Sequence, residues 1–293
     1  MKVSIITPSY NQAKFIEETI RSVIYQAGDF ELDYIIIDGG STDGTLEIIQ
    51  RYAAMVNSSQ FTPHCTRLTF QWHSEQDRGQ SHAINKGFRK TTGDIINWLC
   101  SDDLLTPGAL QTYVDHFTRN PDSHVVTANS CRIDHKGKRI FTISNKPASR
   151  RTILEVWKDS YPIQQPTTFV RKAVLETCGL LNEKNHLYMD YEWHVNIIRH
   201  FDFAFIAKET AYLRYHDRAK SVRYGKKQLV QACEFSRTRW GIHTPYCACS
   251  FFVYGALKKM WACSAWLKER SNIYTMFVQN IKKIPLFAIS SSQ

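Results

Sequence analysis

Residues 1–38 read MKVSIITPSYNQAKFIEETIRSVIYQAGDFELDYIIID, and they are the most informative guide to the architecture of the chain. Val3 to Thr7 is a short β-branched run, which is typical of a strand, and Asn11 follows in a position to cap a helix. Five apolar side chains then recur at helical spacing between residues 15 and 24, and Asp33 to Asp38 is a second apolar strand. The stretch therefore predicts a strand, a helix and a second, parallel strand.

Strands and helices keep alternating as far as about residue 120. Helices are expected at residues 45–55, at 81–89 and at the Thr106-Pro107 pair, where Thr106 would be the N-cap and Pro107 the first helical residue. Strands are expected at 68–72 and 95–100. Such alternation predicts a mostly parallel, doubly wound α/β sheet.

The pattern changes near residue 123. We expect a strand at 124–129, a hairpin around Lys136-Gly137, strands at 165–170 and 203–213, and helices at 190–199 and after about 226. The second half of the sheet is therefore expected to be mixed. These changes divide the chain into a first half, 1–105, a second half, 106–225, and a helical extension, 226–293.

The composition is that of a packed globular protein. The chain has 293 residues, of which 43% are hydrophobic and 22% charged, and this excludes a disordered, collagenous or coiled-coil protein. Eight scattered cysteines form no zinc-binding pattern, and the chain opens on a strand without a signal peptide, so we expect reduced thiols and a cytoplasmic location. No apolar run approaches the roughly 20 residues of a membrane span.

The net charge of +10 is concentrated near the C-terminus. Residues 237–293 hold eight Lys or Arg and one acid, Glu269, interleaved with aromatic side chains. Basic, aromatic helices of this kind are used to lie on anionic membranes, so a peripheral membrane contact is one expectation, and a helical subdomain packed on the core is the other. Confinement of the charge to this segment argues against nucleic-acid binding.

Polar residues follow each of the first four predicted strands. They are Thr7 to Tyr10, Asp38 to Gly44, Glu75 to Gly79 and Ser101 to Asp103. In open α/β sheets the ligands bind beyond the carboxyl ends of the strands, so we expect these four segments to converge on one cleft. Any one of them alone could simply cap the next helix.

Asp102 and Asp103 are the strongest single feature. Two adjacent carboxylates repel each other unless a positive group lies near them, and hard oxygen ligands suit Mg²⁺ or Mn²⁺. The alternative is a solvated acidic turn. The turn after the first strand has no glycine and the chain has no Walker lysine motif, which excludes the common dinucleotide and P-loop folds.

Five stretches resemble family 2 glycosyltransferases in order and spacing. They are VSIITPSYN (3–11), IIIDGGSTDGT (35–45), DRGQSHAINKG (77–87), GDIINWLCSDD (93–103) and QPTTFVR (165–171). The resemblance covers roughly residues 1–220. It implies the GT-A fold for residues 1–225, a Rossmann-like nucleotide-binding core with a mixed central sheet, followed by the helical extension.

The resemblance also implies roles for residues at the matching positions. Donor-binding residues would be Thr7, Pro8, Tyr10, Asp38, Asp77, Arg78 and Asp102. Asp103 would be the direct ligand of Mn²⁺ or Mg²⁺, in a Ser-Asp-Asp variant of the family's DXD motif.

Two further segments resemble family motifs. Met189-Asp190-Tyr191-Glu192 resembles the motif that supplies the catalytic base, which would be Asp190, with Glu192 as the second choice; Asp190 could also cap that helix. Arg214 and His216, followed by Ser221, resemble the segment that closes over the donor, where His216 would reach the metal or the diphosphate. Nearby cations, Arg214 among them, suit a diphosphate.

The function that these features imply is inverting transfer of a sugar from a nucleotide-diphosphate sugar, a UDP-sugar first, to a hydroxyl of a glycan or lipid-linked acceptor in surface polysaccharide synthesis. Two alternatives stay open. One is a nucleotidyltransferase, which would release pyrophosphate. The other is a catalytically inactive protein that binds sugar nucleotides.

Overall fold

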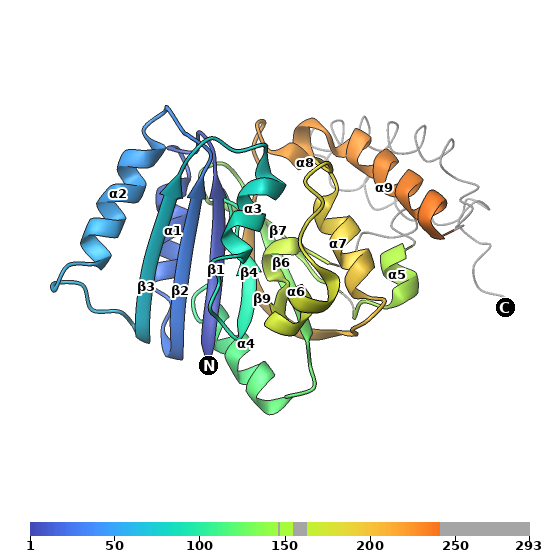
Figure 1. Cartoon of the computed structure of the whole chain (residues 1–293), viewed down its shortest axis with the longest axis horizontal. Coiled ribbons are helices and arrows are strands. Elements are labelled where there is room, and N and C mark those ends of the chain that lie inside the picture. The colour runs from blue at the N-terminus through green and yellow to red at the C-terminus, as the bar shows by residue number, and fades with distance from the viewer. Residues whose placement is uncertain (146, 155–162, 241–293) are drawn as a thin grey trace, which may run out of the picture. The chain divides into compact units, whose positions relative to one another are not determined.

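The computed structural model describes residues 1–145, 147–154 and 163–240, which lie in one compact unit, Met1–Gly241 (Figure 1). The strands in these ranges are β1 (Lys2–Ser9), β2 (Gly28–Asp38), β3 (Cys65–Ser74), β4 (Ile95–Trp98), β5 (Leu104–Leu105), β6 (Val125–Ile133), β7 (Arg139–Ile143), β8 (Phe169–Arg171) and β9 (Phe203–Arg214). The helices are α1 (Ile16–Ile24), α2 (Thr45–Val56), α3 (Gln80–Phe88), α4 (Ala109–Arg119), α5 (Arg150–Leu154), α6 (Lys172–Cys178), α7 (Met189–Ile197), α8 (Lys220–Arg223) and α9 (Gly225–Trp240), with a 3₁₀ turn at Gln165–Thr167.

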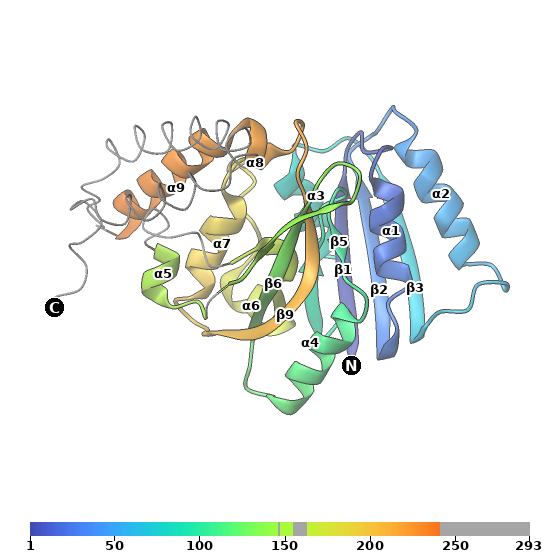
Figure 2. The ribbon, with the colours of Figure 1, turned by 180° about the vertical axis from the view of Figure 1, so that it is seen from behind.

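The first half is a parallel sheet covered on both faces, as the alternation predicts. β3, β2, β1 and β4 lie side by side and parallel. Because successive side chains of a strand point to opposite faces, Ile5 packs into the core shared with α1, α2 and α4, whereas Ile6 contacts Gly87 of α3. Figure 2 shows α1 and α2 in front of the sheet, and Figure 1 shows α3, α6 and α7 before the opposite face.

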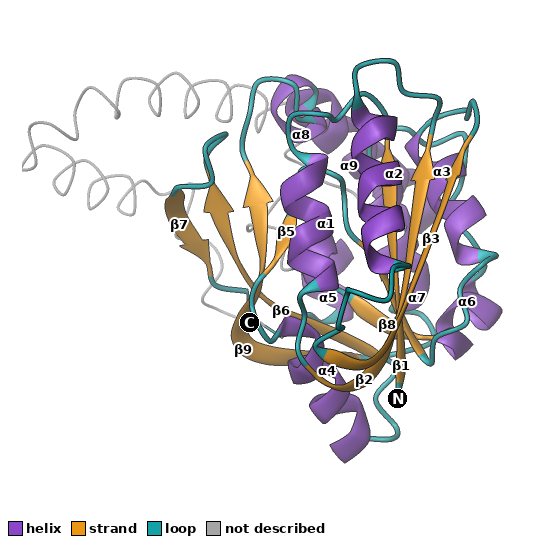
Figure 3. Cartoon of the chain, turned by 90° about the vertical axis from the view of Figure 1, so that its left-hand side faces the viewer, coloured by secondary structure: helices purple, strands orange, loops and turns teal. Residues whose placement is uncertain are grey.

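The second half continues the same sheet with mixed strand directions. β8 is antiparallel to both β4 and β6, β6 is parallel to β9, and β5 and β7 pair antiparallel with β9 and β6. Figure 3 shows β6 and β9 curving away from the first strands. The expected mixed sheet and the hairpin around Lys136-Gly137 are confirmed, with Gly137 at a φ of 82° in the turn.

Several local predictions were wrong. Asn11 caps no helix, because α1 begins at Ile16; its backbone is left-handed, with a φ of 51°, and its side-chain oxygen accepts a hydrogen bond from the Thr42 backbone at 2.9 Å. Residue 108, a glycine, and not Thr106, precedes α4. The strand predicted at 165–170 is a 3₁₀ turn followed by the three residues of β8. Asp190 lies inside α7 and does not cap it, because Tyr188 holds that position.

Other expectations concern thiols and membranes. The five cysteines within the described residues are free thiols, as expected. No helix in the described part of the chain is long and apolar enough to span a membrane. α9 agrees with the helix predicted after residue 226. The basic segment lies almost wholly outside the described residues, and the division at residue 225 stays a prediction.

Candidate active site

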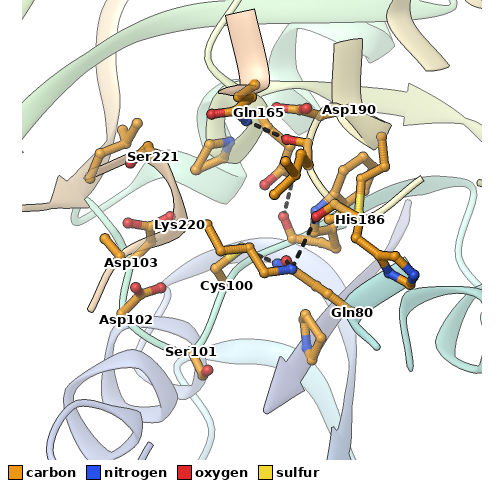
Figure 4. Close-up of a pocket in the computed structure, with 18 of the residues that line it drawn as sticks. Gln80, Cys100, Ser101, Asp102, Asp103, Gln165, His186, Asp190, Lys220 and Ser221 are labelled. Atoms are coloured by element: carbon orange, nitrogen blue, oxygen red, sulfur yellow. Dashed lines mark hydrogen bonds between the residues drawn. The ribbon is translucent and has the colours of Figure 1, made fainter. Parts of the chain in front are cut away.

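A cavity of about 670 Å³ opens at the carboxyl ends of β1 and β4 (Figure 4). Its wall on the side of the first half includes Pro8, Tyr10, Asp77, Asp102 and Asp103. Its opposite wall is formed by the 3₁₀ turn at Gln165, by α7 with Asp190, and by residues of α8 and α9. The predicted convergence of strand ends is thereby borne out for the segments after β1, β3 and β4.

The segment after β2 does not line the cavity, contrary to the prediction, but its Gly39 lies against two residues that do. A Cβ atom on Gly39 would lie 2.5 Å from Asp77 Oδ2 and 3.4 Å from a ring carbon of Tyr10, so only glycine leaves room for both side chains. Asp77 in turn accepts a hydrogen bond from the Gly79 backbone at 2.7 Å. Gly39 therefore lets Tyr10 and Asp77 approach each other beside the cavity.

Three predicted donor-binding residues do not line the cavity. Thr7 is buried and its hydroxyl contacts the Tyr34 hydroxyl at 3.1 Å. Asp38 is fully buried, and its carboxylate accepts hydrogen bonds from the β2–α2 loop and from Ser74. Arg78 is exposed and pairs with Glu183 at 2.5 Å. Contacts of these three side chains with a nucleotide stay predictions.

The acidic turn after β4 is held by the end of β9. The Arg214 backbone donates to Asp103 Oδ1 at 2.9 Å, and His216 Nε2 lies 2.9 Å from Asp102 Oδ2. Burial, together with the negative charge of Asp102, raises the pKa of Asp103 to about 8. The Cys100 sulfur and one oxygen from each aspartate all lie within 4.8 Å of one another.

This donor set fits a divalent cation. Burial and the neighbouring charge of Asp102 both raise the pKa of Asp103, and a bound cation would compensate the negative charge of the two carboxylates. Asp102 and Asp103 would hold it through hard oxygen atoms, as Mg²⁺ and Mn²⁺ prefer. His216, predicted as a ligand, has its Nε2 on Asp102 and its ring 4.7 Å from that of Phe15, so here it positions Asp102.

The buried side chain of Arg214 also holds the acidic turn in place. Its Nε donates to the Asp102 carbonyl at 3.0 Å, and its Nη2 is paired with Glu18 at 2.8 Å. The guanidinium lies 5.0 Å from the centre of the Phe15 ring. Arg214 also lines the cavity, and its contact with a diphosphate stays a prediction.

Asp190 enters the cavity from α7. Its Oδ1 accepts a hydrogen bond from the Tyr191 backbone at 2.9 Å, and burial raises the pKa of its carboxyl group. Glu192, the second choice for a base, does not line the cavity; its carboxylate accepts hydrogen bonds from Asn182 and Asn185. The geometry therefore favours Asp190 over Glu192.

The sequence did not single out Gln80. Lys220 Nζ donates to Gln80 Oε1 at 2.8 Å and reaches the His186 carbonyl at 3.4 Å (Figure 4). Surrounding protein removes water from the ammonium and lowers the pKa of Lys220, although the acids nearby oppose this. Gln80 lies within the 77–87 stretch, and Lys220 is one of the cations that follow His216 in the sequence. Neither position indicated that the two side chains meet.

Comparison with known proteins identifies the family. The model of the family described as glycosyl transferase family 2 matches residues 4–179. The chain belongs to glycosyl transferase family 2.

Two relatives with descriptive names show how far the similarity of this family 2 chain extends. It is 32% identical over 149 residues to a chondroitin synthase of Escherichia coli, and 37% identical over 101 residues to the putative teichuronic acid biosynthesis glycosyltransferase TuaG of Bacillus subtilis. These alignments cover 51% and 34% of the chain. The chain spans only 20% and 36% of the length of the two relatives.

Two solved structures show the GT-A fold. TarS residues 1–349 of S. aureus, in complex with UDP-GlcNAc, superimposes with a TM-score of 0.60 at 19% identity, over 79% of this chain and 65% of that one. The mannosyltransferase PcManGT of Pyrobaculum calidifontis, in complex with GDP-Man and Mn²⁺, gives 0.60 at 20% identity, over 94% and 83%. The expected GT-A architecture of the family 2 chain is thereby confirmed.

Proposed function

We propose that the chain is an inverting, metal-dependent glycosyltransferase that uses a nucleotide-diphosphate sugar. The observation that carries this is the placement of two separate acidic centres in one cavity, the Asp102–Asp103 turn and Asp190 of α7. The first suits the diphosphate end of a donor and the second suits an acceptor hydroxyl. A UDP-sugar is the first donor to test, because TarS binds UDP-GlcNAc in the same fold.

The donor end of the reaction needs charge compensation. A divalent cation bound by Asp102 and Asp103 supplies Lewis-acid stabilisation of the diphosphate leaving group. The chain contributes the rest: Arg214 and His216 hold the two aspartates in place, and Lys220 brings an ammonium group to the same cavity. Tyr10 offers an exposed aromatic face at the end of β1 for the base of the nucleotide.

The acceptor end needs a base. Asp190 takes the proton of the acceptor hydroxyl on its carboxylate while the acceptor oxygen attacks the anomeric carbon and the bond from that carbon to the diphosphate oxygen breaks. A single in-line displacement of this kind inverts the anomeric centre. Burial raises the pKa of Asp190, which brings its basicity closer to neutral pH.

The acceptor is proposed as a glycan or a lipid-linked glycan of a surface polysaccharide. The names of the chondroitin synthase and the teichuronic acid transferase support this class. A lipid-linked acceptor would agree with a cytoplasmic protein that contacts an anionic membrane through residues 237–293, where the basic charge is concentrated.

A donor screen tests the proposal. The full chain is incubated with Mn²⁺ and UDP-, GDP- and dTDP-sugars, and release of nucleoside diphosphate and of pyrophosphate is measured. Diphosphate release that stops with excess EDTA and with Asp103→Asn is expected, while Asp115→Asn, an exposed acid of α4, leaves the rate unchanged. Pyrophosphate release would support the nucleotidyltransferase, and binding without any release would support an inactive binding protein.

A further inference from the structure

Gln165 is a buried polar residue in the wall of the cavity, in the 3₁₀ turn that precedes β8 (Figure 4). Only 8% of it is exposed. A glutamine at such a depth needs hydrogen-bond partners for both its amide nitrogen and its amide oxygen. The partners of these two atoms therefore distinguish a structural role from a role in binding.

The amide nitrogen of Gln165 is fully used by the protein. Its two hydrogens are donated to the Trp98 carbonyl, at 2.6 Å, and to Asn97 Oδ1, at 3.1 Å. Asn97 Nδ2 donates to the Pro166 carbonyl at 2.9 Å, so the oxygen of Asn97 must be the atom that faces Gln165. Because both partners of the Gln165 amide are acceptors, its orientation is fixed by the hydrogen bonds.

The amide oxygen of Gln165 has no such partner. No group in the described part of the chain donates a hydrogen bond to Oε1, and protein does not enclose this atom. An acceptor in a buried side chain is costly to leave unpaired, so a donor must come from the cavity that the residue lines. The nitrogen alone accounts for the structural role, and the oxygen is available to a ligand.

The turn holds this oxygen in place. The Thr167 backbone donates to the Gln164 carbonyl and the Thr168 backbone donates to the Gln165 carbonyl, both at 3.0 Å. Because its backbone and its amide nitrogen are both fixed, the Gln165 side chain loses little conformational freedom when a ligand binds. The acceptor atom is therefore preorganised.

The position of Gln165 indicates which part of a donor it meets. It shares its wall with Asp190, and Tyr10 and the acidic turn lie on the opposite wall. A donor with its base at Tyr10 and its diphosphate at the acidic turn would direct its sugar toward Gln165 and Asp190.

We propose that Gln165 Oε1 accepts a hydrogen bond from a hydroxyl group of the transferred sugar and thereby helps to select that sugar. This role rests on the proposed function, which supplies the positions of the base and the diphosphate.

The fixed orientation makes Gln165 a specificity-determining residue. An oxygen that can only accept distinguishes a sugar that carries a hydroxyl at one position from an analogue that lacks it. A deoxy analogue leaves the buried oxygen without a donor, and this penalty discriminates more strongly than the loss of an apolar contact. Binding of the nucleoside diphosphate alone does not involve the oxygen.

Calorimetry on the full chain with Mn²⁺ tests this role. The probes are UDP and GDP, then UDP-GlcNAc, UDP-glucose and GDP-mannose, and finally the monodeoxy analogues of whichever nucleotide sugar binds most tightly. Gln165→Met removes the acceptor oxygen and keeps a side chain of similar size, and Gln165→Ala is the second variant. Gln111→Met is the matched control, because this partly buried glutamine lies on α4 and does not line the cavity.

We expect one monodeoxy analogue to bind the parent at least about fivefold more weakly than the intact nucleotide sugar. Gln165→Met should bind the intact nucleotide sugar at least about fivefold more weakly than the parent does, with less than about twofold change for UDP or GDP. It should also bind that deoxy analogue and the intact sugar equally well. Gln111→Met should behave as the parent. A merely structural role would weaken the nucleotide and the nucleotide sugar together and would preserve the preference for the hydroxyl.

The proposal is overturned if the parent binds every monodeoxy analogue as tightly as the intact nucleotide sugar. It is equally overturned if Gln165→Met or Gln165→Ala folds and keeps the preference for the hydroxyl. A parent chain that binds no nucleotide sugar refutes the proposed function and this role with it. A parent chain that transfers sugar while a Gln165 variant keeps the preference refutes only the role of Gln165.

Discussion

The substitution Asp190→Asn tests the role of Asp190 as the general base while leaving the rest of the site unchanged. The substitution removes the proton-accepting charge but keeps a side-chain oxygen that can accept the Tyr191 backbone hydrogen bond of 2.9 Å, so α7 should be unchanged. A general base contributes about 10²–10⁴ in rate, which corresponds to about 3–5 kcal/mol of activation free energy. We therefore expect kcat to fall by that factor.

Donor binding should change far less than the rate. Asp190 is not among the ligand atoms grouped at the acidic turn, and loss of its negative charge removes a repulsion toward an incoming diphosphate. We expect the donor dissociation constant to change by less than about fivefold, or about 1 kcal/mol. Calorimetry with the nucleotide sugar measures this, and nucleoside diphosphate release measures kcat.

The dependence of kcat on pH is a second test of the role of Asp190. Because the base must be ionised to accept a proton, kcat should rise with pH through the raised pKa of Asp190 and level off above it. In Asp190→Asn that limb should be absent.

Glu192→Gln is the matched control, because it removes the same charge from the same helix while its side chain can still contact Asn182 and Asn185. An inactive Glu192→Gln beside an active Asp190→Asn would refute the assignment.

Three further predictions concern stability and membranes. Arg214→Met should lower the free energy of unfolding by about 2–3 kcal/mol in denaturant titrations, because the buried guanidinium no longer donates to backbone carbonyls and to Glu18. Gly87→Ala should cost about 1–3 kcal/mol in the same assay, since its Cβ would lie 2.4 Å from a methyl carbon of Ile6. Truncation after residue 236 should weaken sedimentation with anionic vesicles, because each excess basic charge is worth about 1 kcal/mol near such a surface. Added salt should weaken the binding of the full chain, and a full chain that ignores the vesicles at low salt would favour the packed-subdomain alternative.

The regular elements were predictable because their signals are local. β-branched runs and helical spacing depend on neighbouring residues. They located β1, α2 and α3 closely, and they found β2 but missed its first five residues. The acidic pair was predictable for the same reason, since two adjacent carboxylates after a buried strand stand out in the sequence. The prediction that Asn11 caps a helix was wrong because it rested on residue type alone. In the structure the Asn11 side chain joins the loops after β1 and β2.

The features of the site that could not be predicted depend on contacts between residues far apart in the sequence. A strand-end aspartate such as Asp38 can face a ligand or other protein groups. Only the fold shows that its carboxylate accepts three hydrogen bonds from its own loop and one from Ser74 of β3. The link between Lys220 and Gln80 joins residues 140 positions apart, and the brace from Arg214 to Glu18 joins residues 196 positions apart. Spacing along the sequence carries no trace of such pairs.

The single sheet also limits how the protein can move. Strands of both halves belong to one hydrogen-bonded order, β3-β2-β1-β4-β8-β6-β9-β5, so the halves cannot swing apart about a hinge without breaking the ladders of β8. We therefore expect any opening of the cavity to involve short segments at its rim rather than a movement of the two halves. The helix α8 is one such segment. It is four residues long, and the ammonium group of its Lys220 contacts Gln80 and the His186 carbonyl. Exchange of backbone amide hydrogens should accordingly be fast there and slow throughout the central strands.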